Sequence, residues 1–185
     1  MTALEDGTRL NHVEFLHRPG EDSLVVELFE SINCQCELID SPPYGKYIVV
    51  HMDSEFGRND FFASEAEEEQ LALEAAMQRQ IDAPGSDLAG GYAQYRRMLD
   101  QRPYRGSHIG IRLPSVAVYD EVVHRLEGLS AGTFAGRLTV GDTIQRLDEE
   151  PQPGLPRKQV WVWTDLISTG LLSTGQQIEI QTYHD

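Results

Sequence analysis

Residues 107–113 read S-H-I-G-I-R-L, and residues 10–16 read L-N-H-V-E-F-L. Both stretches alternate polar and apolar side chains with a period of two, as a half-buried β-strand does. The polar face begins with His108 in one strand and with His12 in the other. The opposite faces suit a core, with Ile109, Ile111 and Leu113 in one strand and Val13 and Phe15 in the other. The chain thus repeats one kind of strand, which predicts two related modules.

A helix is expected after each of these strands. Asp22 or Ser23 is a suitable N-cap for the first helix, and Ser115 for the second. Apolar residues then recur at i, i+3, i+4 and i+7, the spacing of a helix with one buried side. They are Val25, Leu28, Phe29 and Ile32 in the first half, and Tyr119, Val122, Val123 and Leu126 in the second. Each stripe is predicted to cover the apolar side of the strand before it.

Three further strands are predicted in each half. They span residues 34–39, 46–52 and 59–64 in the first half, and residues 136–140, 159–164 and 176–183 in the second. Proline and glycine clusters mark the turns between them, so both halves have the order β-α-β-β-β. We therefore predict an α+β fold in a single domain, residues 1–185. Its two βαβββ modules, residues 8–65 and 107–185, form curved mixed sheets that enclose one pocket.

Residues 66–106 lie between the modules and are predicted to form a helical insertion. Ser64 and Glu67 have the spacing of a capping box, and helix-forming residues continue to about Ile81. A proline and a glycine then break the helix, and Ser86 or Asp87 caps a second one. Four arginines follow, which we expect to balance nearby carboxylates, with an anionic ligand as the alternative: Arg96, Arg97, Arg102 and Arg105.

The composition limits the partners of the chain. Its 185 residues carry a formal net charge of -15, which would repel nucleic acid and anionic membranes. The sequence contains no apolar run of the roughly 18 residues that a membrane span needs, and its acidic N-terminus does not resemble a secretory signal. Cys34 and Cys36 are one residue apart in a predicted strand, a spacing that disfavours a disulfide. These features predict a cytoplasmic protein with reduced cysteines.

Residues 175–181, G-Q-Q-I-E-I-Q, supply a carboxylate to the predicted site. Alternation gives this strand a polar face made of Gln177, Glu179 and Gln181. Glu179 then faces the same way as His12 and His108 if the two sheets curl around a common cavity. Two imidazoles and one carboxylate on one side of a metal ion leave positions open for substrate, water or oxygen. The sequence therefore predicts a 2-His-1-Glu site for a divalent metal, either Fe, Mn, Zn or Ni.

The paired βαβββ order, the N-H-V and S-H-I histidines, and G-x-x-x-E in the last strand resemble the vicinal oxygen chelate superfamily. This superfamily includes glyoxalase I, extradiol dioxygenases and bleomycin-binding proteins. The resemblance covers most of residues 10–65 and 107–183 and implies His12, His108 and Glu179 as metal ligands. It also implies a homodimer.

The fourth ligand position of the superfamily lies in the last strand of the first module. It falls on Phe61 if Gly57 is aligned with Gly175, and on Asp60 after a shift of one residue, which would also turn Ser64 inward. Three protein ligands are similar to the extradiol dioxygenase pattern. The chain departs from that pattern because no tyrosine precedes the final glutamate.

Two classes of function follow. A metal-dependent enzyme, either a lyase or isomerase or a dioxygenase, would chelate a small substrate through neighbouring oxygens, and Glu14 or His51 would move a proton. A metal-free protein of the same fold would instead bind a small, antibiotic-like molecule between the modules. A third hypothesis is a structural or regulatory protein that uses its acidic helical insertion.

We expect the remaining tryptophan and histidine side chains to pack or to lie on the surface. Trp161 and Trp163 alternate with two valines, so that one pair belongs to the core and the other lines the pocket; we expect the tryptophans mainly to pack. His17, His124 and His184 are predicted to lie on the surface.

Overall fold

The computed structural model describes residues 11–43, 45–52, 60–146 and 155–183. The first half contains β1 (His12–His17), α1 (Asp22–Ser31), β2 (Gln35–Ser41), β3 (Gly45–His51) and β4 (Asp60–Glu65). These strands form one sheet in the order β1-β4-β3-β2. Strand β1 runs parallel to β4, and the other neighbours are antiparallel.

The second half repeats this arrangement. It contains β5 (His108–Leu113), α4 (Val116–Ala131), β6 (Leu138–Val140), β7 (Ile144–Gln145), β8 (Lys158–Thr164), the 3-10 helix η2 (Leu172–Thr174) and β9 (Gln176–Thr182). The strand order is β5-β9-β8-β6, β7 also pairs with β8, and β5 runs parallel to β9. The predicted α+β fold with two sheet modules is confirmed, although the short β7 was not predicted.

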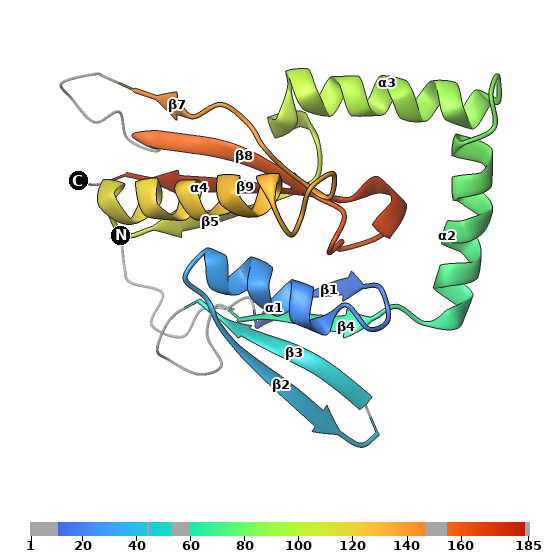
Figure 1. Ribbon diagram of the computed structural model, residues 1–185, viewed down its shortest axis with the longest axis horizontal. Helices are drawn as coiled ribbons and strands as arrows, with labels where there is room; N and C mark the ends of the chain where they lie inside the picture. The colour runs from blue at the N-terminus through green and yellow to red at the C-terminus, as the bar shows by residue number, and fades with distance from the viewer. Residues whose placement is uncertain (1–10, 44, 53–59, 147–154, 184–185) are drawn as a thin grey trace, which may run out of the picture.

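Each module helix uses the predicted apolar stripe. Helix α1 buries Val25, Leu28 and Phe29, and α4 buries four residues of its stripe from Tyr119 to Leu126. Figure 1 shows α1 in front of β1 and β4, and α4 in front of β5 and β9. As predicted, the Ser115 hydroxyl caps α4, accepting from the Val118 amide at 3.2 Å.

The first helix begins differently from the prediction. Its N-cap is Glu21, whose side chain makes no capping hydrogen bond, so the prediction of Asp22 or Ser23 is wrong. Glu21 instead directs its carboxylate to Arg137 of the second module. An interaction between the modules thus takes the place of a local capping hydrogen bond. No local sequence pattern reveals this interaction.

One hydrophobic core runs through both modules. The rings of Phe15, Phe29 and Phe61 pack together in the first module, with centroids 5.2 to 6.0 Å apart. The same cluster of buried side chains includes Leu126 of α4 and Ile180 of β9. Each module therefore buries its apolar sheet face and helix in a core shared with the other.

Residues 66–106 contain the predicted helical insertion. It consists of α2 (Glu68–Ile81), α3 (Asp87–Gln101) and the 3-10 helix η1 (Pro103–Arg105). In Figure 1, α2 leads away from the end of β4, and α3 turns back toward the second module. Ser86 caps α3 as predicted, accepting from the Ala89 amide at 3.0 Å. The predicted capping box is wrong, because Ser64 lies inside β4 and donates its hydroxyl hydrogen to Glu14.

The insertion docks on η2 through a buried carboxylate. Glu74 of α2 is 8% exposed and accepts from the backbone amides of Leu172 at 2.6 Å and Ser173 at 2.8 Å. Tyr92 of α3 donates to the Ser173 carbonyl at 3.1 Å. Over the described ranges, the helices all lack the length and apolar character needed to cross a membrane.

Candidate functional site

The polar face predicted for the second module is present on three neighbouring strands. We call it the second polar face. By register it contains three rows that cross β5, β9 and β8: His108, Gln177 and Trp163; Gly110, Glu179 and Trp161; and Arg112, Gln181 and Gln159. The residues between them along the strands, such as Ile178 and Ile180, are buried in the core as predicted.

His108 and Glu179 meet on this face. His108 Nε2 lies 3.7 Å from Glu179 Oε2, and the two side chains are 31% and 15% exposed. His108 Nδ1 is 3.0 Å from the Gly106 carbonyl, which can only accept, so this nitrogen carries a proton. Burial raises the pKa of Glu179, although the neighbouring His108 acts in the opposite direction. The two side chains therefore place an imidazole and a partly buried carboxyl group next to each other on this face.

The first module has a corresponding polar face on β1, β4 and β3, which we call the first polar face. Its rows are His12, Asp60 and His51; Glu14, Phe62 and Val49; and Leu16, Ser64 and Tyr47. His12 is exposed and stacks flat on Phe62, with ring centroids 4.5 Å apart and planes 5° apart. Glu14 accepts from the Ser64 hydroxyl at 2.5 Å.

His51, a predicted acid-base group, belongs to the first polar face. Its Nδ1 lies 3.0 Å from Asp60 Oδ1, with side chains 11% and 5% exposed, and its Nε2 lies 4.0 Å from Glu37 Oε2. The hydrogen bond with Asp60 holds the imidazole in place on this face. The acid-base roles of Glu14 and His51 stay predictions.

The two registers show which residues occupy equivalent positions in the modules. His12 pairs with Asp60 as His108 pairs with Gln177, so Phe62 occupies the position of Glu179. The alignment that placed Phe61 there is wrong, because Phe61 is 4% exposed and packs in the core. Asp60 does not occupy that position either, because it lies two residues before Phe62 in β4. The first module therefore offers an aromatic ring where the second offers a carboxylate.

The predicted metal ligands do not come together. Among residues 11–43, 45–52, 60–146 and 155–183, no three His, Cys, Asp or Glu side chains lie close enough to hold one metal ion. His108 and Glu179 meet, whereas His12 stacks on Phe62. His12 is therefore not grouped with the other two predicted ligands in the described structure, and the 2-His-1-Glu site stays a prediction.

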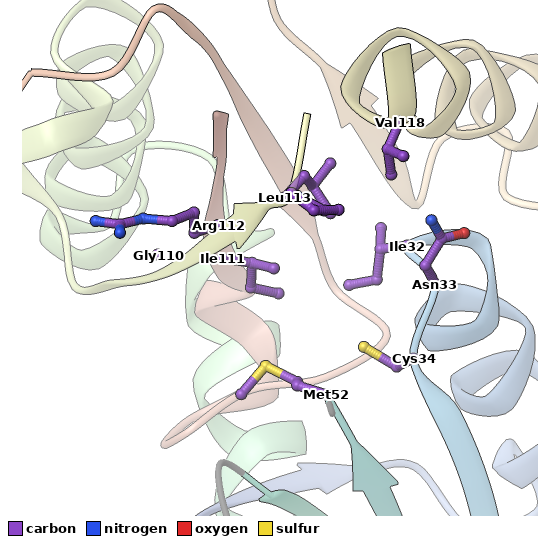
Figure 2. A pocket seen from close by; sticks show the side chains of 10 residues that line it. Ile32, Asn33, Cys34, Met52, Gly110, Ile111, Arg112, Leu113 and Val118 are labelled. Carbon is purple, nitrogen blue, oxygen red and sulfur yellow. The ribbon is translucent and has the colours of Figure 1, made fainter. Parts of the chain in front are cut away.

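A cavity of about 490 Å³ lies between the modules, beside β5. The first module lines it with Ile32, Asn33, Cys34 and Met52, and the second with residues 110–114 and Val118. Figure 2 shows apolar side chains from both modules facing one another across this space, while Arg112 extends away from them. His12, His108 and Glu179 are not part of its wall. The pocket thus lies between the modules, and among the described residues of the two polar faces its wall includes Gly110 and Arg112 of the second face.

Gly110 connects this cavity with the second polar face. It lines the cavity, and a Cβ atom there would lie 3.7 Å from Glu179 Oε2 and 3.6 Å from Gln181 Nε2. Gly110 has no side chain to lie over the Glu179 carboxyl group, which is 15% exposed. A ligand that extends past Gly110 would therefore meet a carboxyl group.

The two cysteines are free, as predicted, and one of them belongs to the cavity wall. Burial raises the pKa of Cys34 to about 12, helped by Cys36. Burial also raises the pKa of Cys36 to about 11, helped by Glu30. A thiolate is the reactive form of cysteine, so Cys34 acts in this cavity as an apolar wall rather than as a nucleophile.

The surface predictions for histidine are correct in one case and wrong in another. His124 is exposed, whereas His17 is fully buried, with its Nδ1 3.0 Å from the Arg18 carbonyl. Extending the alternation of β1 beyond Phe15 would have placed His17 on the core side. His184 lies outside the described residues.

The tryptophans occupy the polar side of β8. Val160 and Val162 are buried, and Trp161 and Trp163 face the second polar face. Trp161 packs edge-on against His108, with ring centroids 4.8 Å apart. Sequence alternation correctly separated the two pairs, but it did not identify the arginine that stacks on Trp163.

No protein-family model matches the chain, and no curated protein matches it. The crystal structure of UcmS2 is similar to it with a TM-score of 0.46 and 12% identity, covering 95% of this chain and 98% of that one. The crystal structure of protein PA1353 from Pseudomonas aeruginosa is similar with a TM-score of 0.47 and 10% identity, covering 97% of this chain and 100% of that one. Likenesses this weak carry no inference about function.

Proposed function

We propose that the chain is a small-molecule-binding protein that holds a mainly apolar ligand between its two modules, without a metal ion. The observation that carries this proposal is the cavity of about 490 Å³ lined by both modules. Ligand pockets in proteins commonly have volumes of about 300–1,000 Å³ and mostly apolar walls. The size and lining of this cavity suit an organic molecule of modest size.

The chemistry of the wall indicates the class of ligand. Most of its side chains are aliphatic or contain sulfur, including Ile32, Met52 and Leu113. The side-chain oxygen of Asn33, Oδ1, already accepts a hydrogen bond from Arg125. Because most side chains of the wall are apolar, a strongly polar ligand would lose part of its hydration without compensation. An alkyl or aromatic body therefore fits better.

Titration with N-phenyl-1-naphthylamine, a neutral apolar dye whose fluorescence rises in apolar surroundings, tests this function. We expect saturable binding of one dye molecule per chain. Val118→Phe adds volume at the cavity wall and should weaken dye binding at least tenfold, which corresponds to about 1.4 kcal/mol. A neutral dye is needed because the net charge of -15 would repel an anionic one.

Val26→Phe is the matched control. Val26 is also partly buried against the core, but it does not line the cavity. Both variants carry the same risk of overpacking, so their melting temperatures are compared first. The proposal fails if wild type does not bind the dye, or if Val118→Phe and Val26→Phe bind it equally well.

A metal-dependent enzyme is the second candidate, and the pairing of His108 with Glu179 favours it. Metal content measured on protein purified without a chelator separates the two. Under our proposal, bound metal stays well below one ion per chain and does not differ in His12→Ala or Glu179→Ala. About one ion per chain, lost in both variants, would establish the predicted triad and overturn the metal-free proposal.

A further inference from the structure

The arginines of α3 and η1 have no carboxylate partners in the described part of the chain. Arg18, Arg125 and Arg137 are described arginines that do make ion pairs. The expectation that Arg96, Arg97, Arg102 and Arg105 balance nearby carboxylates is therefore wrong for the described residues. A cationic cluster that has no carboxylate partner within the described ranges is unexpected in a protein of net charge -15.

Arg96 is the member of this cluster that lies against the second polar face. Its guanidinium stacks over Trp163, with Cζ 3.8 Å from the ring centroid. Its Nη1 is buried and has no hydrogen-bond partner among residues that the structure describes. A buried donor on a charged group costs free energy unless an acceptor meets it. The stacking fixes the guanidinium while leaving that donor unsatisfied.

A second unsatisfied group flanks the same tryptophan. Gln177 is the neighbour of Trp163 across the β8–β9 register and is 6% exposed. Its Oε1 accepts no hydrogen bond within the described ranges. An unmet cationic donor and an unmet neutral acceptor thus both neighbour Trp163, and His108 follows Gln177 in the same row.

These observations favour one kind of ligand. Arg96 requires an acceptor, preferably anionic, and Gln177 requires a donor such as a hydroxyl. Glu179 lies two residues from Gln177 on the same face, so a doubly charged phosphate is disfavoured relative to a single carboxylate. The rings of Trp161 and His108 provide an aromatic wall next to these groups.

We propose that Arg96 and Gln177 form a binding site for the carboxylate end of a small hydroxylated aromatic acid. Arg96 is the counter-ion of the carboxylate, and Gln177 accepts from the hydroxyl. Neither residue lines the cavity between the modules, so this site is independent of the function proposed above.

Intrinsic fluorescence measures binding directly, because the only two tryptophans of the chain, Trp161 and Trp163, both lie on this face. We expect benzoate to change the fluorescence saturably and the uncharged benzamide to bind at least tenfold more weakly. The tightest of the three hydroxybenzoate isomers should bind better than benzoate. This gain should disappear in Gln177→Leu.

Arg96→Met keeps an unbranched side chain over Trp163 but removes the charge, and should weaken benzoate binding at least tenfold. Arg97→Met removes the same charge from the next, exposed position of α3 and should leave binding unchanged within twofold. Equal binding of benzoate and benzamide to wild type would overturn the proposal without any variant. Equal losses in Arg96→Met and Arg97→Met would overturn it too, because they would indicate general electrostatic attraction.

Discussion

Glu179 is a carboxyl group that the fold keeps largely out of water. Burial raises its pKa, with the opposing effect of His108 too small to cancel it. The folded chain therefore holds this proton more tightly than the unfolded chain does. That contribution to stability is present at low pH and is lost as the pH rises through the folded pKa.

Glu179→Gln removes this pH dependence, because an amide is neutral at every pH. We expect the melting temperature of the variant to exceed that of wild type at pH 7, and the difference to shrink toward pH 4. Glu69→Gln, at an exposed position of α2, controls for the loss of one negative charge from an acidic protein. A Glu179→Gln variant that melts below wild type at pH 7 would show that the carboxylate makes a favourable ionic contact with His108.

At the residue scale, period-two alternation correctly placed Glu179 and Gln181 of β9 on one face and the buried Ile178 and Ile180 on the other. It failed where the counting began at the wrong residue. Counting from Gly57, which lies outside the described residues, placed Phe61 on the polar face, whereas the register puts Phe62 there. The metal triad rested on a further assumption, that both polar faces share one cavity. Alternation fixes a side chain's face within a sheet but not the packing of two sheets.

At the scale of elements, Glu74 holds the helical insertion against the second module. Burial alone would raise its pKa, but hydrogen bonds from Ser173, Leu172 and Gln70 outweigh burial and lower it. A lowered folded pKa gives stability that is present above the unfolded pKa and is lost as the pH falls through the folded one. The docking of α2 on η2 should therefore weaken in acid.

Glu74→Gln should destabilise the protein by about 2 kcal/mol at pH 7, because charge-assisted hydrogen bonds to two amides are weakened. Amide hydrogen exchange at Leu172 and Ser173 should accelerate more than exchange in β3. Glu69→Gln on the same helix should change neither. If exchange at Leu172 and Ser173 stays at the wild-type rate in Glu74→Gln, this carboxylate does not hold the insertion in place.

The helices of the modules could be predicted from sequence because their apolar stripes repeat with the helical period, and Ser86 and Ser115 carry local capping signals. The start of α1 could not, since Glu21 bonds to Arg137, 116 residues away. The buried role of Glu74 was equally hidden, because a glutamate in a run of glutamates is typical of a solvated helix face. An interaction with a residue distant in sequence does not alter the local periodicity, so the local pattern cannot predict it.

At the scale of the whole molecule, Arg137 joins the two modules. Its Nη1 and Nη2 donate to Glu21 of the first module at 2.7 and 2.9 Å, and its Nε donates to Asp165 of the second at 2.8 Å. Arg18 adds a bond from its Nη1 to the Asp165 carbonyl at 2.7 Å. The side chains of Arg137, Glu21 and Asp165 are only about a quarter exposed. Their ion pairs are therefore screened less than those of surface ions. The cavity between the modules depends on the same relative placement.

Arg137→Met should lower the free energy of unfolding by about 2 kcal/mol, since Glu21 and Asp165 lose their charged donor while remaining partly buried. Lys158→Met, which breaks a pair with the exposed Asp120 inside the second module, should lower the free energy of unfolding by less.

The shared core predicts that wild type and Arg137→Met both melt in a single calorimetric transition. Two separate transitions in Arg137→Met would mean that the ion pairs, rather than the common core, make the modules fold as one unit. The apolar dye would then lose its site in that variant, because a cavity with one wall from each module exists only while both walls are held together.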